Sequence, residues 1–490
     1  MDFLDPKKQK AHSVRLLIGY ALIGAALVMA TTILLYQAYG YGVDRNGRVF
    51  QNGLLFMSSR PSGAAIYSNG ERQKSDTNSR LAFPAGQYVF ELKRDGYRDW
   101  KRAITVEGGS VQRFDYPLLF PKELKTSITK QYSAQPGALM QSPDRRWLMV
   151  QSTSPNIFDI YDLNTDNPTA QQITVPTDSM SAGTITLGWE QLEWANNNRH
   201  VLLRRTYDRA GSSGQEYILF DREEPEESTN LSVLLGFTPS DIALRDKKFD
   251  QYYAFDQNNG TLFSASIEEP TPQPLLEDVL AFESEGPDTL LYVTSKDAPK
   301  GKSLVRLMEG DDDYLLRQVA SGSPYLLELG RYEGNWLVVA GVASEDRVYV
   351  YKNPLDTLRS GERKAAAPVY ILKTPAPGYL SFSVNGRFAM IENGDSFAVY
   401  DAETDKGYAY ALQIPVDAPL GRATWMDGHR LQLVSNGQLV VFDFDGTNRQ
   451  TLMSLHPGFT PYYNRDYGFA YTISPAFALS STSLRIPEDQ

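Results

Sequence analysis

The sequence predicts a mainly β protein made of a membrane-spanning helix, a small β-sandwich and a β-propeller. Residues 16–36 contain no charged side chain, and residues 53–120 have the pattern of short strands joined by turns. Residues 124–490 repeat a strand pattern about every 46 residues, the length of one four-stranded propeller blade. Strand-favouring tyrosine and phenylalanine are abundant, and no long stretch after Tyr41 shows the 3.6-residue period of a helix.

The apolar segment 16–36 predicts a transmembrane signal-anchor helix. At about 1.5 Å of rise per residue it is long enough for the ~30 Å hydrocarbon layer. The basic residues before it are Lys7, Lys8, Lys10 and Arg15. Because basic residues stay on the cytoplasmic side, the N-terminus is expected inside and the bulk of the chain outside. A cleaved signal peptide is the alternative, but its apolar core is shorter, and residues 37–40 form a poor cleavage site.

Charge and composition exclude several classes of function. The formal net charge is −11, and the part after residue 40 carries 44 basic against 57 acidic residues, or −13. This argues against nucleic acid or an anionic lipid surface as the main partner. The chain has no cysteine, which rules out thiolate metal sites and thiol nucleophiles. Its four histidines are His12, His200, His429 and His456, too few for a histidine-rich metal site.

Residues 53–120 predict an all-β domain. Residues 68–71 and 84–86 have the composition of tight turns, because Asn69 and Gly70 tolerate positive φ and Pro84 is followed closely by Gly86. Residues 88–92 alternate well enough for a half-buried strand, and residues 111–116 form a last strand.

Residues 59–70, SRPSGAAIYSNG, resemble the opening of a PEGA domain, with its S-x-P-x-G-A-x-[VI]-[YF]-x-[DN]-G pattern. The later half of that pattern is matched by Pro84, Gly86, residues 88–92, Gly96, Tyr97 and Trp100. The chain departs from the family at residues 74–78, where KSDTN replaces the usual Gly-x-Thr-Pro. The resemblance implies a small β-sandwich of bacterial surface proteins, often beside a membrane anchor, that serves as a stalk and has no catalytic residues.

The repeat is clearest in four places. Each copy begins on an apolar or aromatic residue, continues through a polar turn into an apolar strand, and ends about twenty residues later on a strand that closes with aromatic-Asp. These copies begin at Met140, Trp194, Phe382 and Trp425, and their closing aspartates are Asp162, Asp221, Asp401 and Asp443. Weaker copies start near Leu244, Phe282, Leu329 and Tyr462.

The spacing therefore predicts eight blades, with seven as the alternative. The last unit is short, and residues 126–132, which precede the first unit, are expected to supply its outer strand and close the ring. The units resemble the TolB-like and WD40-like repeats of bacterial propellers through their Trp-x-x-Asp/Asn-Gly opening and aromatic-Asp strand.

Several acidic clusters could bind a cation, but their sequences are better explained as turns or exposed loops. Asp443, Asp445 and Gly446 resemble a calcium loop, but the glycine spacing is that of a hairpin turn. Residues 311–313, three aspartates, are expected at a solvated loop tip, and residues 223–227, EEPEE, in an exposed loop.

Aromatic and catalytic motifs give no site either. Trp147, Trp189, Trp194, Trp336 and Trp425 are candidates for stacking on sugar rings, but Trp194 and Trp425 occupy a repeat position that indicates blade core. His200 opens a strand and His429 lies in a turn, and the chain has no G-x-S-x-G, HExxH or P-loop motif. We therefore assign no catalytic, cofactor-binding or metal-ligating residue, and expect no bound transition metal and no ester or peptide hydrolysis.

These observations predict a single-pass membrane protein at a bacterial cell surface. Residues 1–15 form the cytoplasmic tail, 16–36 the anchor in the lipid bilayer, 37–52 a linker, 53–120 the sandwich and 124–490 the propeller. The expected role is non-enzymatic binding or scaffolding of a protein or cell-envelope glycan. The alternative is a glycan hydrolase or lyase with paired carboxylates in the propeller mouth.

Overall fold

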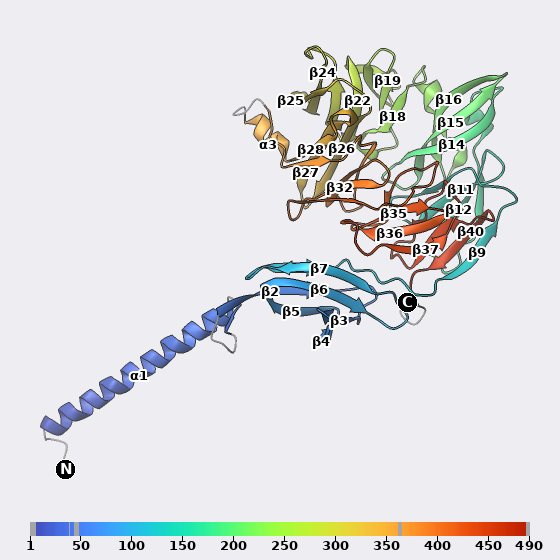
Figure 1. Cartoon of the computed structure of the whole chain (residues 1–490). Helices are drawn as coiled ribbons and strands as arrows, with labels where there is room; N and C mark the ends of the chain where they lie inside the picture. The colour runs from blue at the N-terminus through green and yellow to red at the C-terminus, as the bar shows by residue number, and fades with distance from the viewer. Residues whose placement is uncertain (1–5, 39, 44–48, 361–364, 487–490) are drawn as a thin grey trace. The chain divides into compact units, whose positions relative to one another are not determined.

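The chain divides into two compact units, residues 1–123 and 124–488. The structure is a computed structural model that describes residues 6–38, 40–43, 49–360 and 365–486 (Figure 1). Parts of the expected tail (1–5) and linker (39 and 44–48) lie outside the described residues. The two units are described separately below.

The first unit begins with helix α1 (Pro6–Ala38), which extends beyond both ends of the predicted 16–36 segment. Its stretch His12–Tyr36 has a mean hydropathy of 2.1, and no part of that stretch is buried within the protein. At about 1.5 Å per residue, these 25 residues exceed the ~30 Å hydrocarbon layer. The helix is therefore long and apolar enough to cross a membrane.

Two four-stranded sheets follow in the first unit. One contains β1 (Tyr41–Val43), β2 (Val49–Met57), β5 (Ser79–Pro84) and β8 (Val111–Phe114). The other has the order β4-β3-β6-β7 and contains β3 (Ala65–Ser68), β4 (Glu71–Asp76), β6 (Gly86–Lys93) and β7 (Trp100–Val106). Both predicted turns are present, because β3 and β4 are joined at Asn69-Gly70, with φ of 49° and 85°, and β5 and β6 at Ala85.

The sandwich starts earlier than the sequence indicated. The expected linker 37–52 includes β1 and the beginning of β2, which pair with each other from Tyr41↔Gln51 to Val43↔Val49. Polar Gln51 and Asn52 interrupt the apolar pattern here, so the sequence did not show that the strand begins before Gly53. The core between the sheets includes Leu55, Ile66 and Phe90, each fully buried.

The second unit contains eight four-stranded antiparallel sheets within the described residues, which confirms eight blades rather than seven. The first four are blade 1, β10 (Leu139–Gln141), β11 (Trp147–Gln151), β12 (Ile157–Asp162) and β13 (Gln171–Thr174); blade 2, β14 (Ile185–Trp194), β15 (His200–Arg209), β16 (Ser212–Asp221) and β17 (Thr229–Asn230); blade 3, β18 (Asp241–Leu244), β19 (Gln251–Asp256), β20 (Thr261–Ser266) and β21 (Gln273–Leu276); and blade 4, β22 (Val279–Glu285), β23 (Thr289–Thr294), β24 (Lys302–Glu309) and β25 (Asp312–Ala320).

The other four complete the ring. They are blade 5, β26 (Tyr325–Tyr332), β27 (Asn335–Val342), β28 (Arg347–Lys352) and β29 (Tyr370–Lys373); blade 6, β30 (Tyr379–Phe382), β31 (Phe388–Glu392), β32 (Ser396–Asp401) and β33 (Lys406–Ala411); blade 7, β34 (Thr424–Trp425), β35 (Arg430–Ser435), β36 (Gln438–Asp443) and β37 (Gln450–Ser454); and blade 8, β38 (Tyr462–Tyr463), β39 (Phe469–Ile473), β40 (Ala478–Ser483) and β9 (Lys125–Gln131).

Short helices lie in the connections between strands. The α-helices are α2 (Leu231–Leu234) and α3 (Pro354–Arg359), and the 3₁₀ turns are η1 (Thr177–Ser179), η2 (Pro225–Glu227), η3 (Arg245–Lys247) and η4 (Ala343–Glu345).

Ring closure follows the predicted arrangement. Strand β9 lies before blade 1 in the chain but pairs with β40, from Ala478↔Gln131 to Ser483↔Lys125. The hydroxyls of Thr126 and Thr482 lie 2.9 Å apart across this pair. The two ends of the propeller sequence therefore share one sheet.

The repeated polar turn fixes the start of each well-matched second strand. In blade 1, the Ser142 hydroxyl accepts from the Trp147 backbone N–H (2.9 Å), while Asp144 accepts from the Arg146 N–H (3.1 Å). Blade 6 repeats the arrangement, with Ser383 accepting from the Phe388 N–H at 3.0 Å. These side-chain acceptors satisfy backbone donors that the turn would otherwise leave unpaired.

A buried carboxylate lies at the seam between blades 6 and 7. Glu392, at the end of β31, is 0% exposed, and its Oε1 accepts from the Ala423 backbone N–H at 2.8 Å. Its Oε2 has no hydrogen-bond partner among the described residues. Burial raises the pKa of Glu392 to about 8, against an ordinary value of 4.5.

We expect this carboxyl to make stability fall with rising pH. The folded state holds the proton up to about pH 8 and the unfolded state loses it near 4.5, so stability declines as pH rises through this window, by up to about 3–5 kcal/mol. Glu392→Gln stays neutral, and its melting temperature should therefore fall less than that of the wild type between pH 5 and pH 9. Parallel pH profiles for the two proteins would contradict the assignment.

Candidate functional site

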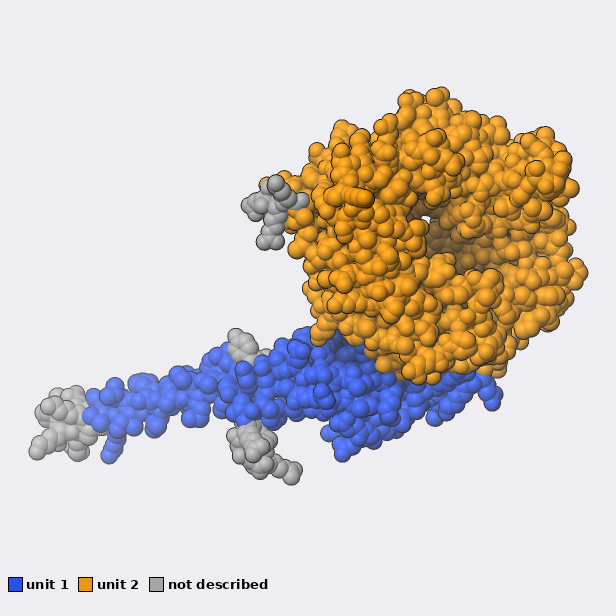
Figure 2. Space-filling view, turned by 45° about the horizontal axis from the view of Figure 1, so that its top comes forward, with its two compact units in different colours: residues 1–123, 489 blue, residues 124–488, 490 orange. Residues whose placement is uncertain are grey.

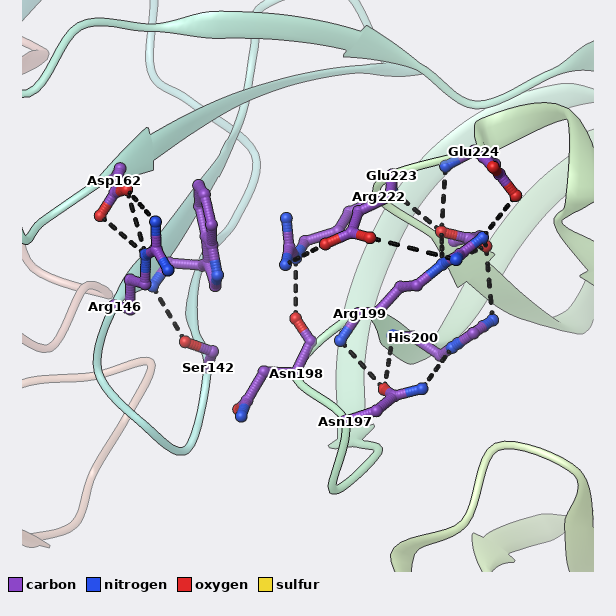
Figure 3. A network of polar contacts seen from close by, with 12 residues as sticks. Ser142, Arg146, Asp162, Asn197, Asn198, Arg199, His200, Arg222, Glu223 and Glu224 are labelled. Atoms are coloured by element: carbon purple, nitrogen blue, oxygen red, sulfur yellow. Dashed lines mark hydrogen bonds and ion pairs between the residues drawn. The ribbon is translucent and has the colours of Figure 1, made fainter.

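The aromatic-Asp signature proves to be structural. The closing aspartates Asp162, Asp221 and Asp401 each pair with the arginine that precedes the neighbouring strand of the same blade. The N–O distances are 2.7 Å for Arg146–Asp162 (Figure 3), 2.5 Å for Arg199–Asp221 and 2.8 Å for Arg387–Asp401. Asp221 and Asp401 are each 1% exposed or less. Each of these ion pairs stabilises a turn within its blade. Because the aspartate and the arginine bind each other, neither is free to bind a ligand.

The acidic segment 223–227 belongs to the same network. Glu224 accepts from Arg199 at 2.7 Å, and Arg222 binds Glu223 at 2.8 Å (Figure 3). The Arg222 guanidinium also lies 4.0 Å from the Trp147 ring centroid, with Arg146 at 4.6 Å. Trp147 is therefore covered by two arginines and is not a free sugar-stacking platform.

The two histidines singled out by the sequence have packing roles. The His200 ring stacks on Phe249 with centroids 4.3 Å apart, and its Nδ1 lies 2.8 Å from Asn197. Burial lowers the pKa of His200, which keeps the ring neutral near pH 7. His429 packs edge-to-face on Phe388 with centroids 5.5 Å apart.

The remaining candidate residues from the sequence also have structural roles. Asp443 and Gly446 form the expected hairpin turn, in which Asn448 donates to Asp443 at 2.8 Å. Trp194 is 3% exposed, which confirms its core position, whereas Trp425 is half-buried and stacks on the buried Phe388.

Residues 311–313 are exposed at the hairpin between β24 and β25, as expected, but Asp313 also makes side-chain contacts within blade 4. It lies in β25, where its Oδ2 accepts from the Tyr292 hydroxyl and the Arg306 guanidinium, each at 2.8 Å. This triad lines a cavity of about 380 Å³ beside Lys296 and Glu277. The sequence could not show the interaction, because its partners come from two other strands of blade 4.

The central channel contains a cluster that no local motif announced. The first strand of each blade lies nearest the axis, and these strands contact one another around the ring, as β22 does with β26 and β26 with β30. Figure 2 shows the channel opening in the middle of the second unit. The first strands of blades 2 to 5 carry the carboxylates Glu190, Glu193, Asp241, Glu283, Glu285 and Glu328.

These channel carboxylates act on one another. Burial, and after it the charges of Glu328, Glu193 and Asp241, raise the pKa of Glu283 to about 8. The pKa of Glu328 is raised to about 7 by burial and by Glu285. Glu283 and Glu328 are partly exposed in the channel, so a solute that enters it can reach them.

Two cations oppose this charge. Lys247 lowers the pKa values of Glu193 and Glu328, although burial and the other carboxylates outweigh it and both values stay raised. Arg204 pairs with Glu190. The first strands of blades 6, 7, 8 and 1 contain no charged residue at all. The channel wall is therefore acidic on one side and neutral on the other.

Exposed apolar side chains mark one mouth of this channel. Because every first strand runs in the same direction, their N-terminal ends meet at one face. There Ile185 (69% exposed) and Leu187 (62%) begin β14, while Leu280 lies at the start of β22 and Tyr379 at the start of β30. We call these four residues the apolar mouth.

Sequence reasoning missed the channel site because its members come from four blades. A local signal was nevertheless present. Glu193 lies between Leu192 and Trp194, and Glu328 between Leu327 and Leu329, so each carboxylate interrupts an apolar strand. Among the described residues, no group of carboxylates and histidines has a geometry that would hold a metal ion.

Comparison with known proteins identifies the first unit more closely than the second. Residues 52–119 match the model of the PEGA domain family. No curated protein matches the sequence. Among solved structures, the chain is similar to the Dos1 propeller (11% identity, TM-score 0.43, covering 74% of this chain and 95% of that one). It is also similar to Kluyveromyces lactis Hsv2p (10%, 0.40, 66% and 100%) and to the dihydro-heme d1 dehydrogenase NirN (14%, 0.42, 66% and 66%).

These structural likenesses are too distant to carry an argument about function. The strand topology itself defines the second unit, and the family match defines the first. The chain therefore carries a PEGA domain at residues 52–119, followed by an eight-bladed β-propeller.

Proposed function

We propose that this protein is a membrane-anchored binding platform that holds a partner protein at the apolar mouth of its propeller, outside the cytoplasm. The proposal is supported mainly by the exposure of Ile185, Leu187, Leu280 and Tyr379, which lie near the N-terminal ends of first strands at one face of the ring. Exposed apolar side chains on the same face of several blades favour a protein interface there. The formal net charge of −11 disfavours nucleic acid as the partner.

Photo-crosslinking tests this proposal in intact cells. A photoreactive residue at position 187 should yield a discrete crosslinked product, whereas one at Ile267 should not. Ile267 is the matched control because it is also exposed but follows β20, whose end lies at the opposite face. Absence of a product at positions 187 and 280, or equal products at 187 and 267, would contradict the proposal.

The anchor is part of the proposal. The apolar surface of α1 between His12 and Tyr36 is unburied and requires a nonpolar environment. The basic residues before it favour a cytoplasmic N-terminus, and the PEGA domain suits an extracytoplasmic stalk at a bacterial surface.

Protease accessibility checks this topology. Protease added to intact cells, or to spheroplasts if an outer membrane is present, should digest the propeller and leave a short protected fragment that carries the N-terminus. The same fragment should vanish once detergent is added. A mature protein that begins near Gly40 would show instead that the helix is a cleaved signal peptide.

A glycan hydrolase is the second candidate function, and the channel carboxylates favour it. Glu283 and Glu328, with pKa values of about 8 and 7, have the protonation behaviour of a general acid near neutral pH. Turnover of envelope glycan by the full chain, lost in Glu283→Gln and in Glu328→Gln, would support this function. Equal product formation by the wild type and both variants would exclude it.

A further inference from the structure

We infer that the apolar mouth and the acidic channel wall together form a docking surface for an extended peptide segment of the partner that carries apolar residues followed by lysine or arginine. This inference rests on the proposed binding function and specifies the chemistry of the partner. Its apolar residues would lie against the mouth, and its basic residues would enter the channel along β14.

The geometry of β14 supports an extended occupant. Strands β14, β15 and β16 each contain ten residues, whereas the first strand of blade 1 contains three. As the first strand of its sheet, β14 pairs only with β15. Its other edge therefore has backbone groups available for an added strand. A bulge between Thr186 and Gly188 lies beside Leu187.

Charge complementarity identifies the basic part of the occupant. Along β14, the exposed Ile185 and Leu187 are followed by Glu190 and Glu193. Glu190 interacts with Asp241 of β18, and Glu193 with Glu283 and Glu285 of β22. Across the cluster, six carboxylates meet two cations, Arg204 and Lys247. A strand that enters from the mouth thus meets apolar groups first and an excess of negative charge next.

The repulsion between the carboxylates gives a second reason for a cationic occupant. Lysine or arginine placed among them would relieve the like-charge interactions that now favour the protonated forms. Because Glu283 and Glu328 take up protons between about pH 8 and pH 6, binding should weaken as the solution is acidified through this range.

Three fluorescein-labelled nonapeptides test the inference on the full chain in detergent. The first alternates leucine with serine and ends in three lysines, the second has glutamate in place of lysine, and the third has serine in place of leucine. Fluorescence anisotropy should show the first binding at least about tenfold more tightly than either of the others, since each lacks one of the two recognised features.

Matched variants locate the binding. At pH 9, where Glu283 is ionised, Glu193→Gln/Glu283→Gln should weaken binding of the first peptide about tenfold, and Leu187→Ser about fivefold. Glu226→Gln/Glu227→Gln removes the same charge from the 223–227 segment, outside the channel, and should change affinity less than about twofold. Equal binding of the lysine and glutamate peptides, or equal loss in the channel and control variants, would overturn the inference.

Two further outcomes separate this inference from the proposed function. If spermidine displaces the peptide and Leu187→Ser has no effect, the channel binds small polycations and the peptide inference fails. If the first peptide does not bind while the crosslink at position 187 persists, the platform function stands and the peptide chemistry is wrong. Loss of both signals would overturn both.

Discussion

Deleting residues 462–490 should unfold the whole propeller while the PEGA domain stays folded. The deletion removes β38, β39 and β40, so that β9 loses its only partner strand. It also takes Tyr471, Ile473 and Leu479 out of the buried cluster that blade 8 shares with blade 1.

The size of the loss explains why the effect should reach every blade. Burying one such side chain stabilises by about 1.5–3 kcal/mol, so these three residues alone contribute on the order of 5–9 kcal/mol. That is comparable with the net stability of a typical domain, about 5–15 kcal/mol. The deletion would also leave blades 1 and 7 with open faces, because each would lose the neighbouring blade that covers it.

Hydrogen–deuterium exchange with peptide resolution measures the two units separately. Amides of β11, β23 and β35 should lose protection in the truncated chain, while those of β6 and β7 keep theirs. A chain lacking only residues 487–490 serves as the control and should behave as the wild type. Retained protection in blades 2 to 6 of the truncated chain would show that the propeller does not depend on closure.

The blades that the sequence predicted best share one turn chemistry. Blades 1 and 6 both begin the second strand with a serine and an Asp or Asn that accept from the backbone, as Ser142 and Ser383 do. Blade 5 instead turns at Glu333 and Gly334, and blade 3 passes through η3. These blades matched the repeat poorly because a different local solution connects equivalent strands.

The candidate site was beyond sequence prediction for a different reason. The aromatic-Asp repeat was the strongest pattern in the chain, and it proved to be an internal ion pair. Glu193 and Glu328 belong to blades 2 and 5, and only ring formation brings them into the same channel. Local motifs therefore predicted the scaffold, whereas the site depends on the long-range geometry of the ring.

The largest effect of a single substitution is expected at Arg205. Arg205 and Glu216 are each 1% exposed, and Arg205 Nη1 lies 2.5 Å from Glu216 Oε1. Burial opposes ionisation of Glu216, but hydrogen bonds from Ser181, Asn230 and Arg205 outweigh it and hold the pKa below its usual value. The pair is thus a buried, hydrogen-bonded salt bridge in the sheet that carries Ile185 and Leu187.

Arg205→Met should destabilise the propeller by about 3–5 kcal/mol, because it leaves the Glu216 charge buried without its partner. Arg205→Met/Glu216→Leu should recover most of that loss, since no buried charge remains. Arg204→Met is the matched control on the same strand, and its exposed pair with Glu190 predicts a loss below about 1 kcal/mol. Urea unfolding followed by tryptophan fluorescence measures all three variants.

The same variant connects stability to binding. Arg205 Nε donates to the Thr186 hydroxyl at 2.7 Å, and Thr186 lies between Ile185 and Leu187 in β14. Losing this bond should release the beginning of the strand, so Arg205→Met should weaken binding of the leucine–lysine peptide even at temperatures where the propeller remains folded. A loss no larger than that of Glu226→Gln/Glu227→Gln would mean that packing, and not the buried pair, holds the start of β14 in place.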